Sequence, residues 1–293
     1  MLFTGTGVAI VTPFKDDRAV DFDALRRIVN HCIGGQVDYI VVLGTTGESM
    51  TLSDKEKVDV AHCVVDAAAE RVPIVIGVGG NDTEKVVNTI KHTNFEGISG
   101  LLSATPYYNR PVQDGLIEHY KAVAAASPVP VIMYNVPSRT GVNMTAETTL
   151  TLAHEVGNIV AIKEASGILA QLMKIIRDRP DNFSVISGDD AISLPLVALG
   201  GQGVISVAAN AFPQEMTTII RESLVNNCQA AQTIQYAMLG LFETLFVEGN
   251  PSGIKAALNI LGLSQNVLRL PLVPVSKNTY DQLESLIHKM ELK

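Results

Sequence analysis

Two apolar segments of the chain each end in a side chain that can take part in carbonyl chemistry. Residues 159–163 (IVAIK) end in the amine of Lys163, and residues 129–134 (VPVIMY) end in the phenol of Tyr134. Burial lowers the pKa of a lysine, which leaves more free amine to attack a carbonyl carbon and form an imine. A neighbouring phenol can move protons during that reaction. Taken singly, a lysine paired with Glu164 and a tyrosine packed at a rim are the plain alternatives.

Two further segments carry groups that suit carboxylates. Residues 43–48 (LGTTGE) place the hydroxyls of Thr45 and Thr46 between two glycines, in a turn whose backbone N–H groups can face an anion. Residues 137–141 (PSRTG) present Arg139, whose guanidinium can grip a carboxylate with two parallel hydrogen bonds. An ordinary loop and a surface arginine are the alternatives. Together, the four segments predict an imine-forming enzyme whose substrates carry carboxylates.

The elements that must position these groups alternate regularly. Nearly continuous apolar runs, typical of parallel strands covered on both faces, are separated by segments of helical period. The spacing of about 28 residues per unit favours an α/β fold of the (β/α)8 TIM-barrel type over an open doubly wound sheet. The strand ends would then share one mouth, where Lys163 and Tyr134 meet. The eight strands are predicted at residues 7–12, 39–43, 73–77, 100–103, 129–134, 159–163, 183–187 and 203–206.

Helix signals complete this organisation. Residues 53–56 (SDKE) form a capping-box pattern, and Asp21 and Thr145 can cap the helices that follow them. After residue 206 the pattern is helical, with helices predicted at residues 213–227, 229–246, 251–261 and 279–290. We expect a barrel over residues 1–230 and a C-terminal helical region, residues 231–293, packed on it.

Composition excludes several classes of protein. The 293 residues are 47% hydrophobic and carry a net charge of −8, from 22 basic and 30 acidic residues, which argues against a disordered chain and a nucleic-acid partner. The first 14 residues lack a secretory pattern, and no apolar run approaches the roughly 18 residues of a membrane span. We expect a cytoplasmic protein without a membrane partner. Cys32, Cys63 and Cys228 are few, odd in number and widely spaced, so they are predicted to be buried free thiols.

Other polar signals are weaker. The six histidines fall in or beside predicted helices without metal-binding spacing, so neither a metal nor another cofactor is expected beyond a covalent imine on Lys163. Residues 77–81 (GVGGN) lack the third glycine and the acidic residue of a dinucleotide site and fit a barrel loop. Asp189 and Asp190 are expected to cap the next helix rather than to serve as a catalytic carboxylate pair.

The ordered series of motifs resembles the dihydrodipicolinate synthase family of pyruvate-dependent Schiff-base enzymes. The resemblance runs from about residue 5 to residue 263 and rests on GTTGES (44–49), PYYNRP (106–111), YNVPSRTG (134–141), IVAIKEASG (159–167), SGDD (187–190) and GVISVAAN (203–210). It implies a lyase that binds pyruvate as an imine and condenses it with L-aspartate 4-semialdehyde, in diaminopimelate and lysine biosynthesis.

Residue roles follow from the resemblance. It implies that Lys163 forms the imine, that Tyr134 donates and accepts protons, and that Thr45 relays them. Tyr108 would complete the relay from a neighbouring subunit of a homotetramer. Three residues would bind substrate: Thr46 the pyruvate carboxylate, Arg139 the carboxylate of the semialdehyde, and Ile205 the pyruvate through its backbone.

Two departures from the family pattern affect the expectations. Many members read NPIPVK where residues 250–255 read NPSGIK, and we expect this segment to lie far from the chemistry. Lysine-sensitive members have histidines where this chain has Asp54 and Lys57, and a glutamate where it has Lys85. Added ammonium groups repel an ammonium ligand, so weak or absent lysine inhibition is expected. The residues that resemble the effector site are Ser49, Met50, Asn81 and Tyr107.

Rival functions share part of the pattern. N-acetylneuraminate lyase and the 2-keto-3-deoxy sugar-acid aldolases have the same lysine, tyrosine and GxxGE loop. Arg139 and the tyrosine pair of PYYNRP favour the synthase, because a short semialdehyde needs its carboxylate held. A catalytically inactive pyruvate sensor or scaffold is a third possibility, disfavoured by the joint presence of Lys163, Tyr134, Thr45 and Arg139.

Overall fold

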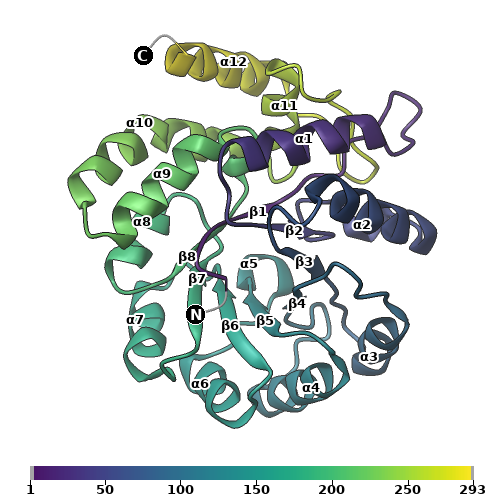
Figure 1. The fold of residues 1–293 in the computed structure, drawn as a ribbon, viewed down its shortest axis with the longest axis vertical. Helices are drawn as coiled ribbons and strands as arrows, with labels where there is room; N and C mark the ends of the chain where they lie inside the picture. Colours follow the sequence, from purple (N-terminus) through teal and green to yellow (C-terminus); the bar gives the residue numbers. More distant parts are fainter. Residues whose placement is uncertain (1–2, 292–293) are drawn as a thin grey trace.

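Eight parallel strands pair in chain order and close into a barrel, because β8 also pairs with β1 (Figure 1). The computed structural model describes residues 3–291. Closure excludes the open sheet and confirms the predicted (β/α)8 architecture. The strands are β1 (Gly5–Ala9), β2 (Tyr39–Val42), β3 (Ile74–Gly77), β4 (Gly100–Ala104), β5 (Val131–Asn135), β6 (Ile159–Glu164), β7 (Ser184–Ser187) and β8 (Gly203–Ser206).

The first strand ends earlier than predicted. Beyond β1, the backbone N–H of Val11 donates to Oδ1 of Asn210 at 3.0 Å, and the Thr12 hydroxyl donates to the carbonyl of Gly47 at 2.7 Å. These residues are as buried as the strand itself. A continuous apolar run therefore does not mark where the backbone leaves the sheet.

Helices surround the barrel and bury their apolar faces against it (Figure 1). The predicted caps are present: Ser53 and Glu56 form a reciprocal capping box, Asp21 accepts from the N–H of Ala24, and Thr145 accepts from that of Thr148. The surrounding helices are α1 (Phe22–Gly34), α2 (Asp54–Ala68), α3 (Thr83–His92), α4 (Gln113–Ala126), α6 (Ala146–Glu155), α7 (Leu169–Asp178), α8 (Ser193–Ala198) and α9 (Pro213–Leu224).

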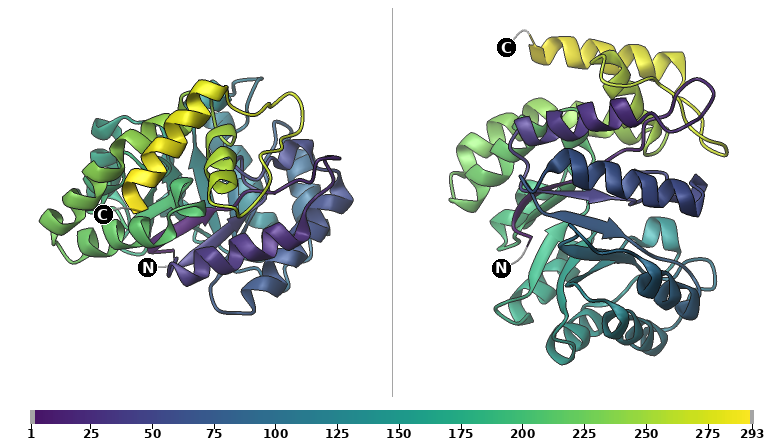
Figure 2. Two further views of the ribbon diagram at one scale, coloured as in Figure 1. Left: turned by 90° about the horizontal axis from the view of Figure 1, so that it is seen from above. Right: turned by 45° about the vertical axis from the view of Figure 1, so that its right-hand side comes forward.

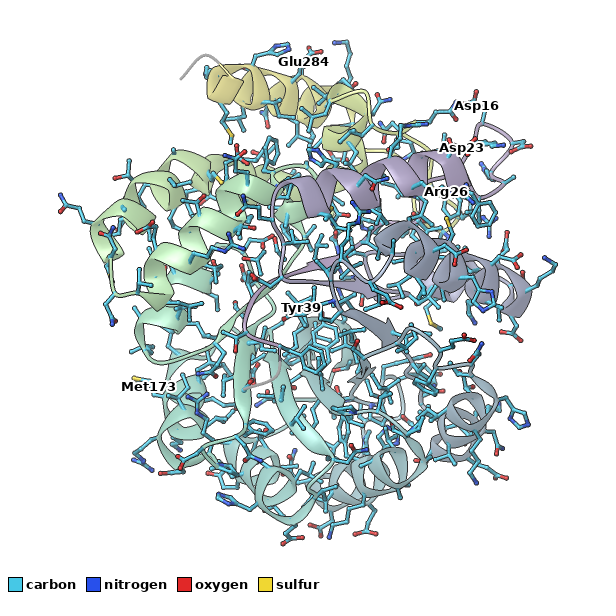
Figure 3. The ribbon with its side chains drawn as sticks, in the orientation of Figure 1. Asp16, Asp23, Arg26, Tyr39, Met173 and Glu284 are labelled. Atoms are coloured by element: carbon cyan, nitrogen blue, oxygen red, sulfur yellow. The ribbon has the colours of Figure 1, made fainter. Side chains whose placement is uncertain are left out.

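Side chains fill the inside of the barrel below its mouth. Tyr39, the first residue of β2, lies at the centre of the barrel in Figure 3, with the ring of Phe3 5.6 Å from its own. Gly7 on the neighbouring strand makes room for it, since a Cβ there would collide with the Tyr39 ring. The interior cluster, which also includes Ile205, is thus a packed core. Ligands must bind at the mouth.

Three helices form the C-terminal region: α10 (Cys228–Phe246), α11 (Ser252–Ile260) and α12 (Lys277–Glu291). α10 packs on α8 and α9, and α11 and α12 pack on α10 and on each other. Figure 2 shows α12 on the outside of this group. Cys32 and Cys63 are buried free thiols as predicted, whereas Cys228 is only half-buried. Among residues 3–291, no helix combines the length and apolarity needed to cross a bilayer.

Candidate active site

Tyr134 and Lys163 lie side by side at the carboxyl ends of β5 and β6. The strand register pairs the two residues directly, and Nζ of Lys163 lies 4.4 Å from the centroid of the Tyr134 ring. Both side chains are buried, Lys163 with 5% of its surface exposed. The amine and the phenol thus meet within a largely dehydrated site.

The environment of Lys163 favours its neutral form. The pKa of this amine is lowered to about 8, chiefly by burial; the charge of Asp190 opposes the shift, and the positive charge of Arg139 adds to it. About one amine in ten is then neutral at pH 7, against roughly three in ten thousand for an ordinary lysine. Gly188 provides the space for this side chain, because a Cβ there would lie 3.1 Å from Cε of Lys163. The site therefore supplies a nucleophilic amine near neutral pH.

Tyr134 is suited to donating a proton. Burial raises the pKa of its phenol to about 12, an effect opposed by the charge of Arg139 and by a hydrogen bond with the Thr45 side chain. The phenol is therefore protonated at neutral pH. The hydrogen bond with Thr45 joins it to a hydroxyl that is exposed in the single chain, so protons can pass between the buried ring and the mouth.

The loop of residues 43–48 follows β2 and has the form of an anion site. The backbone N–H groups of Gly47 and Glu48 donate within the loop, to Gly44 and Thr45. Those of Thr45 and Thr46 have no acceptor within residues 3–291. The left-handed residues of the loop are Leu43 and Glu48, with φ of 59° and 50°, and not the two glycines. The sequence thus indicates the site but not which residues bend the chain.

Arg139 lies on α5 (Pro137–Thr140), a single turn directly after β5. Its Nη2 donates to the backbone carbonyl of Asn250 at 3.2 Å. Nδ2 of the same Asn250 donates to Oγ1 of Thr46 at 3.0 Å. The expectation that residues 250–255 lie far from the chemistry is therefore wrong. More than 200 residues separate Asn250 from Thr46 along the chain, so no local pattern reveals the contact.

These groups share one open cavity of about 1390 Å³ at the barrel mouth. Ile205 lies beneath it in the barrel interior rather than on its wall. Tyr108 is also absent from the wall: the residue is 88% exposed, and its backbone is left-handed, with a φ of 70°. The predicted site residues that line the cavity are Lys163, Tyr134, Thr45, Thr46 and Arg139.

Three of the four residues that resemble an effector site line the same cavity, and Asn81 does not. Ser49, Met50 and Tyr107 line it, and so do Asp54 and Lys57. Nζ of Lys57 lies 3.2 Å from Oδ1 of Asp54, so part of its charge is neutralised within α2. The carbonyl of Asn81 accepts a hydrogen bond from Asn109, and Lys85 pairs with Asp82 at 3.8 Å.

Asp190 has a role that the sequence analysis missed. Its Oδ2 accepts from the backbone N–H groups of Val207 and Ala208, at 3.1 and 2.9 Å, and so ties the end of β7 to the end of β8. Burial raises the pKa of its carboxyl to about 6. The expectation that it caps the next helix is wrong, because Ile192 is the N-cap of α8 and no side chain caps that helix. Among the residues described, no group of three or more histidines, cysteines and carboxylates could hold a metal.

Comparison with known proteins agrees with this geometry. The model of the dihydrodipicolinate synthetase family matches residues 2–290. The 4-hydroxy-tetrahydrodipicolinate synthase of Parabacteroides distasonis is 50% identical over 289 residues, which cover 99% of this chain and 97% of that protein. Dihydrodipicolinate synthase from Aquifex aeolicus has a TM-score of 0.95 at 41% identity, and that from Cyanidioschyzon merolae with lysine bound has 0.95 at 40%; each match covers 99% of both chains. The chain belongs to the dihydrodipicolinate synthetase family.

Proposed function

We propose that this chain condenses pyruvate with L-aspartate 4-semialdehyde through an imine on Lys163, as a 4-hydroxy-tetrahydrodipicolinate synthase of diaminopimelate and lysine biosynthesis. The observation that carries the proposal is the buried amine of Lys163 against the Tyr134 ring, at 4.4 Å, in a cavity that also holds Thr46 and Arg139. The names of the full-length relatives favour this function over the sugar-acid lyases.

The first half of the reaction uses the amine and the phenol. The carboxylate of pyruvate lies on the Thr45–Thr46 turn, and the neutral amine of Lys163 attacks the ketone carbon. One N–H proton of the amine passes to the ketone oxygen to give a carbinolamine. Tyr134 then donates its proton to the hydroxyl, which leaves as water, and Thr45 relays a proton from solvent at the mouth to the Tyr134 phenolate. The product is a protonated imine at a site where burial already disfavours competing hydrolysis by bulk water.

The second half forms the carbon–carbon bond. Transfer of a methyl proton to solvent in the cavity gives an enamine, which attacks the aldehyde carbon of the second substrate while Arg139 holds its carboxylate. The aldehyde oxygen takes up a proton and becomes a hydroxyl. The substrate amine then adds to the imine carbon, and Lys163 leaves as the ring closes. Holding the two carboxylates in fixed positions orients both substrates relative to Lys163, which lowers the barrier.

The proposed assembly is a cytoplasmic homotetramer in which Tyr108 enters the site of a neighbouring subunit. Two observations support it: Tyr108 is 88% exposed and does not line its own cavity, and Thr45, its proposed partner, is exposed in the single chain. A shared site can be tested by mixing subunits that carry Tyr108→Phe with subunits that carry Lys163→Ala.

Random mixing in equal amounts makes half of all interface pairs hybrid, and each hybrid pair has one complete site. Activity should therefore return to about a quarter of the wild-type value. Each parent alone should remain nearly inactive. Activity of the mixture no higher than the mean of its parents would reject donation across an interface. Sedimentation of the wild-type protein measures the subunit number independently.

The chemical proposal is tested by substrate comparison and trapping. Purified protein should turn over pyruvate with aspartate semialdehyde, and it should leave N-acetylneuraminate and 2-keto-3-deoxygluconate uncleaved. Borohydride with pyruvate alone should leave a reduced adduct on Lys163, found by peptide mass spectrometry, and none in Lys163→Ala. Turnover of a sugar acid only would assign the chain to the sibling lyases, and an unmodified Lys163 would reject imine chemistry altogether.

A further inference from the structure

Asn250 contacts both carboxylate-binding elements of the cavity. Its side-chain Nδ2 donates to Oγ1 of Thr46 at 3.0 Å, and its backbone carbonyl accepts from Nη2 of Arg139 at 3.2 Å. The residue is itself 7% exposed and lines the cavity. One residue of the C-terminal region thus joins the turn after β2 to the short helix after β5.

The direction of the hydrogen bond to Thr46 has a chemical consequence. A threonine hydroxyl has one hydrogen to donate and two lone pairs that accept. Because the amide of Asn250 occupies a lone pair of the Thr46 oxygen, the hydroxyl hydrogen is directed elsewhere. Thr46 is buried and lines the cavity, so its hydrogen is available to a carboxylate bound there.

The amide also has an acceptor without a partner. Oδ1 of Asn250 is buried and receives no hydrogen bond within the described chain. An unsatisfied buried acceptor is costly. The packing around the amide does not satisfy this oxygen, and the one hydrogen bond that the Asn250 side chain makes within the described residues is the one to Thr46.

The rest of the segment holds Asn250 in place. Lys255, on the next helix α11, pairs with Glu48 two residues after Thr46, and it donates to the carbonyl of Val267 at 3.0 Å. The other carboxylate oxygen of Glu48 accepts from the backbone N–H of Arg269 at 3.2 Å. The turn after β2 is therefore fixed to the C-terminal region at two side chains, Thr46 and Glu48.

We propose that Asn250 is a positioning residue for the reaction: its amide fixes the Thr46 hydroxyl as a donor to the carboxylate of the 2-oxo acid, and its carbonyl orients Arg139 for the second carboxylate. This inference rests on the proposed function, since it takes Thr46 to bind pyruvate. It predicts that side-chain replacements weaken the first carboxylate site most, because they leave the backbone carbonyl that meets Arg139 in place.

The test measures the pyruvate concentration that gives half-maximal borohydride trapping on Lys163. Asn250→Ala should raise that concentration about tenfold, the effect of one lost hydrogen bond to a charged group. Asn250→Asp, nearly the same shape, should raise it more, because a carboxylate turns the Thr46 hydrogen toward itself and repels the substrate. In both variants, the KM for aspartate semialdehyde should change by a smaller factor than the pyruvate concentration that gives half-maximal trapping.

A double-mutant cycle separates positioning from general damage. If the amide acts through Thr46, then Asn250→Ala should have no further effect on pyruvate binding in a Thr46→Val background. Asn259→Ala is the matched control, since Asn259 lies on α11, which begins two residues after Asn250, and donates to the carbonyl of Ser264 away from the cavity. It should lower the melting temperature without changing pyruvate trapping.

Multiplicative effects of the two changes, or unchanged pyruvate binding in both Asn250 variants, would overturn the inference. Trapping needs only pyruvate and is independent of the second substrate. A wild-type protein that forms the adduct but ignores the semialdehyde would therefore reject the proposed synthase activity and leave the Asn250 comparison intact. A wild-type protein without an adduct would reject both.

Discussion

Glu48 and Lys255 form an ion pair in which neither side chain has any exposed surface. The Lys255 ammonium also lies 4.0 Å from the centroid of the Phe14 ring. Burial lowers the pKa of Lys255, and the charge of Glu48 opposes that shift. The pair joins the turn after β2 to α11, so its energy bears on the stability of the C-terminal region and on the shape of the site.

Lys255→Met should lower the free energy of unfolding by about 3–5 kcal/mol, because it leaves the Glu48 carboxylate buried without a counter-charge. Urea denaturation followed by circular dichroism measures the change. The double variant Glu48→Gln, Lys255→Met should be more stable than Lys255→Met alone. Lys277→Met removes an exposed pair with Asp281 and should leave the free energy of unfolding nearly unchanged. Equal losses in the buried and exposed variants would contradict this account.

The rate of imine formation should rise with pH with a midpoint near 8, because the amine of Lys163 must lose its proton before it attacks. Asp190→Asn removes the negative charge that raises the pKa of Lys163, so the midpoint should move to lower pH. Stopped-flow trapping of pyruvate across pH 6 to 10 reports both values. An unchanged midpoint in Asp190→Asn would show that the Asp190 charge does not affect the pKa of Lys163.

Gly188→Ala should slow imine formation about a hundredfold, because displacing the amine by up to about 1 Å misaligns it with the carbonyl carbon that it attacks. The added Cβ would lie 2.7 Å from Cβ of Ala165 and 3.1 Å from Cε of Lys163. Gly157→Ala is the control, because no atom lies within 4 Å of a Cβ there. If the melting temperature of Gly188→Ala falls as its trapping rate falls, the slower reaction would instead indicate a general packing defect.

L-Lysine should inhibit the condensation weakly, with a midpoint in the millimolar range or higher. Lys57 lies on the cavity wall at the effector side, and its charge is only partly offset by Asp54. An initial-rate titration with lysine at fixed substrate concentrations measures the midpoint. Lys57→His, which resembles the residue of lysine-sensitive members, should strengthen inhibition. A sub-millimolar midpoint in the wild-type protein would show the prediction to be wrong.

The barrel could be predicted from the sequence because its evidence is local. Apolar runs mark the strands, and the Ser53 and Thr145 caps mark helix starts within a few residues. The meeting of Tyr134 and Lys163 could also be predicted, since adjacent strands in a closed barrel bring their ends together. These conclusions need only the order of elements and the rule that parallel strands share one mouth.

Contacts between distant parts of the chain could not be predicted in this way. Asn250 reaches Thr46, and Asp190 binds the backbone after β8, through tertiary geometry that no spacing encodes. One signal was present but unused: Lys255 stands in an otherwise apolar helix, and a lysine in such a position needs a buried partner. That partner, Glu48, would have brought residues 250–255 to the site.

The hydrogen bond between Asn250 and Thr46 spans 204 residues of sequence. Because Asn250 follows Ser206, the last residue of β8, the ribosome synthesises every barrel strand, including the one that bears the reactive amine, before the residue that orients the carboxylate turn. A nascent chain of this kind carries its nucleophile without the means to hold a 2-oxo acid firmly. The ability to hold a 2-oxo acid for reaction is thus acquired late in synthesis, together with the C-terminal helices.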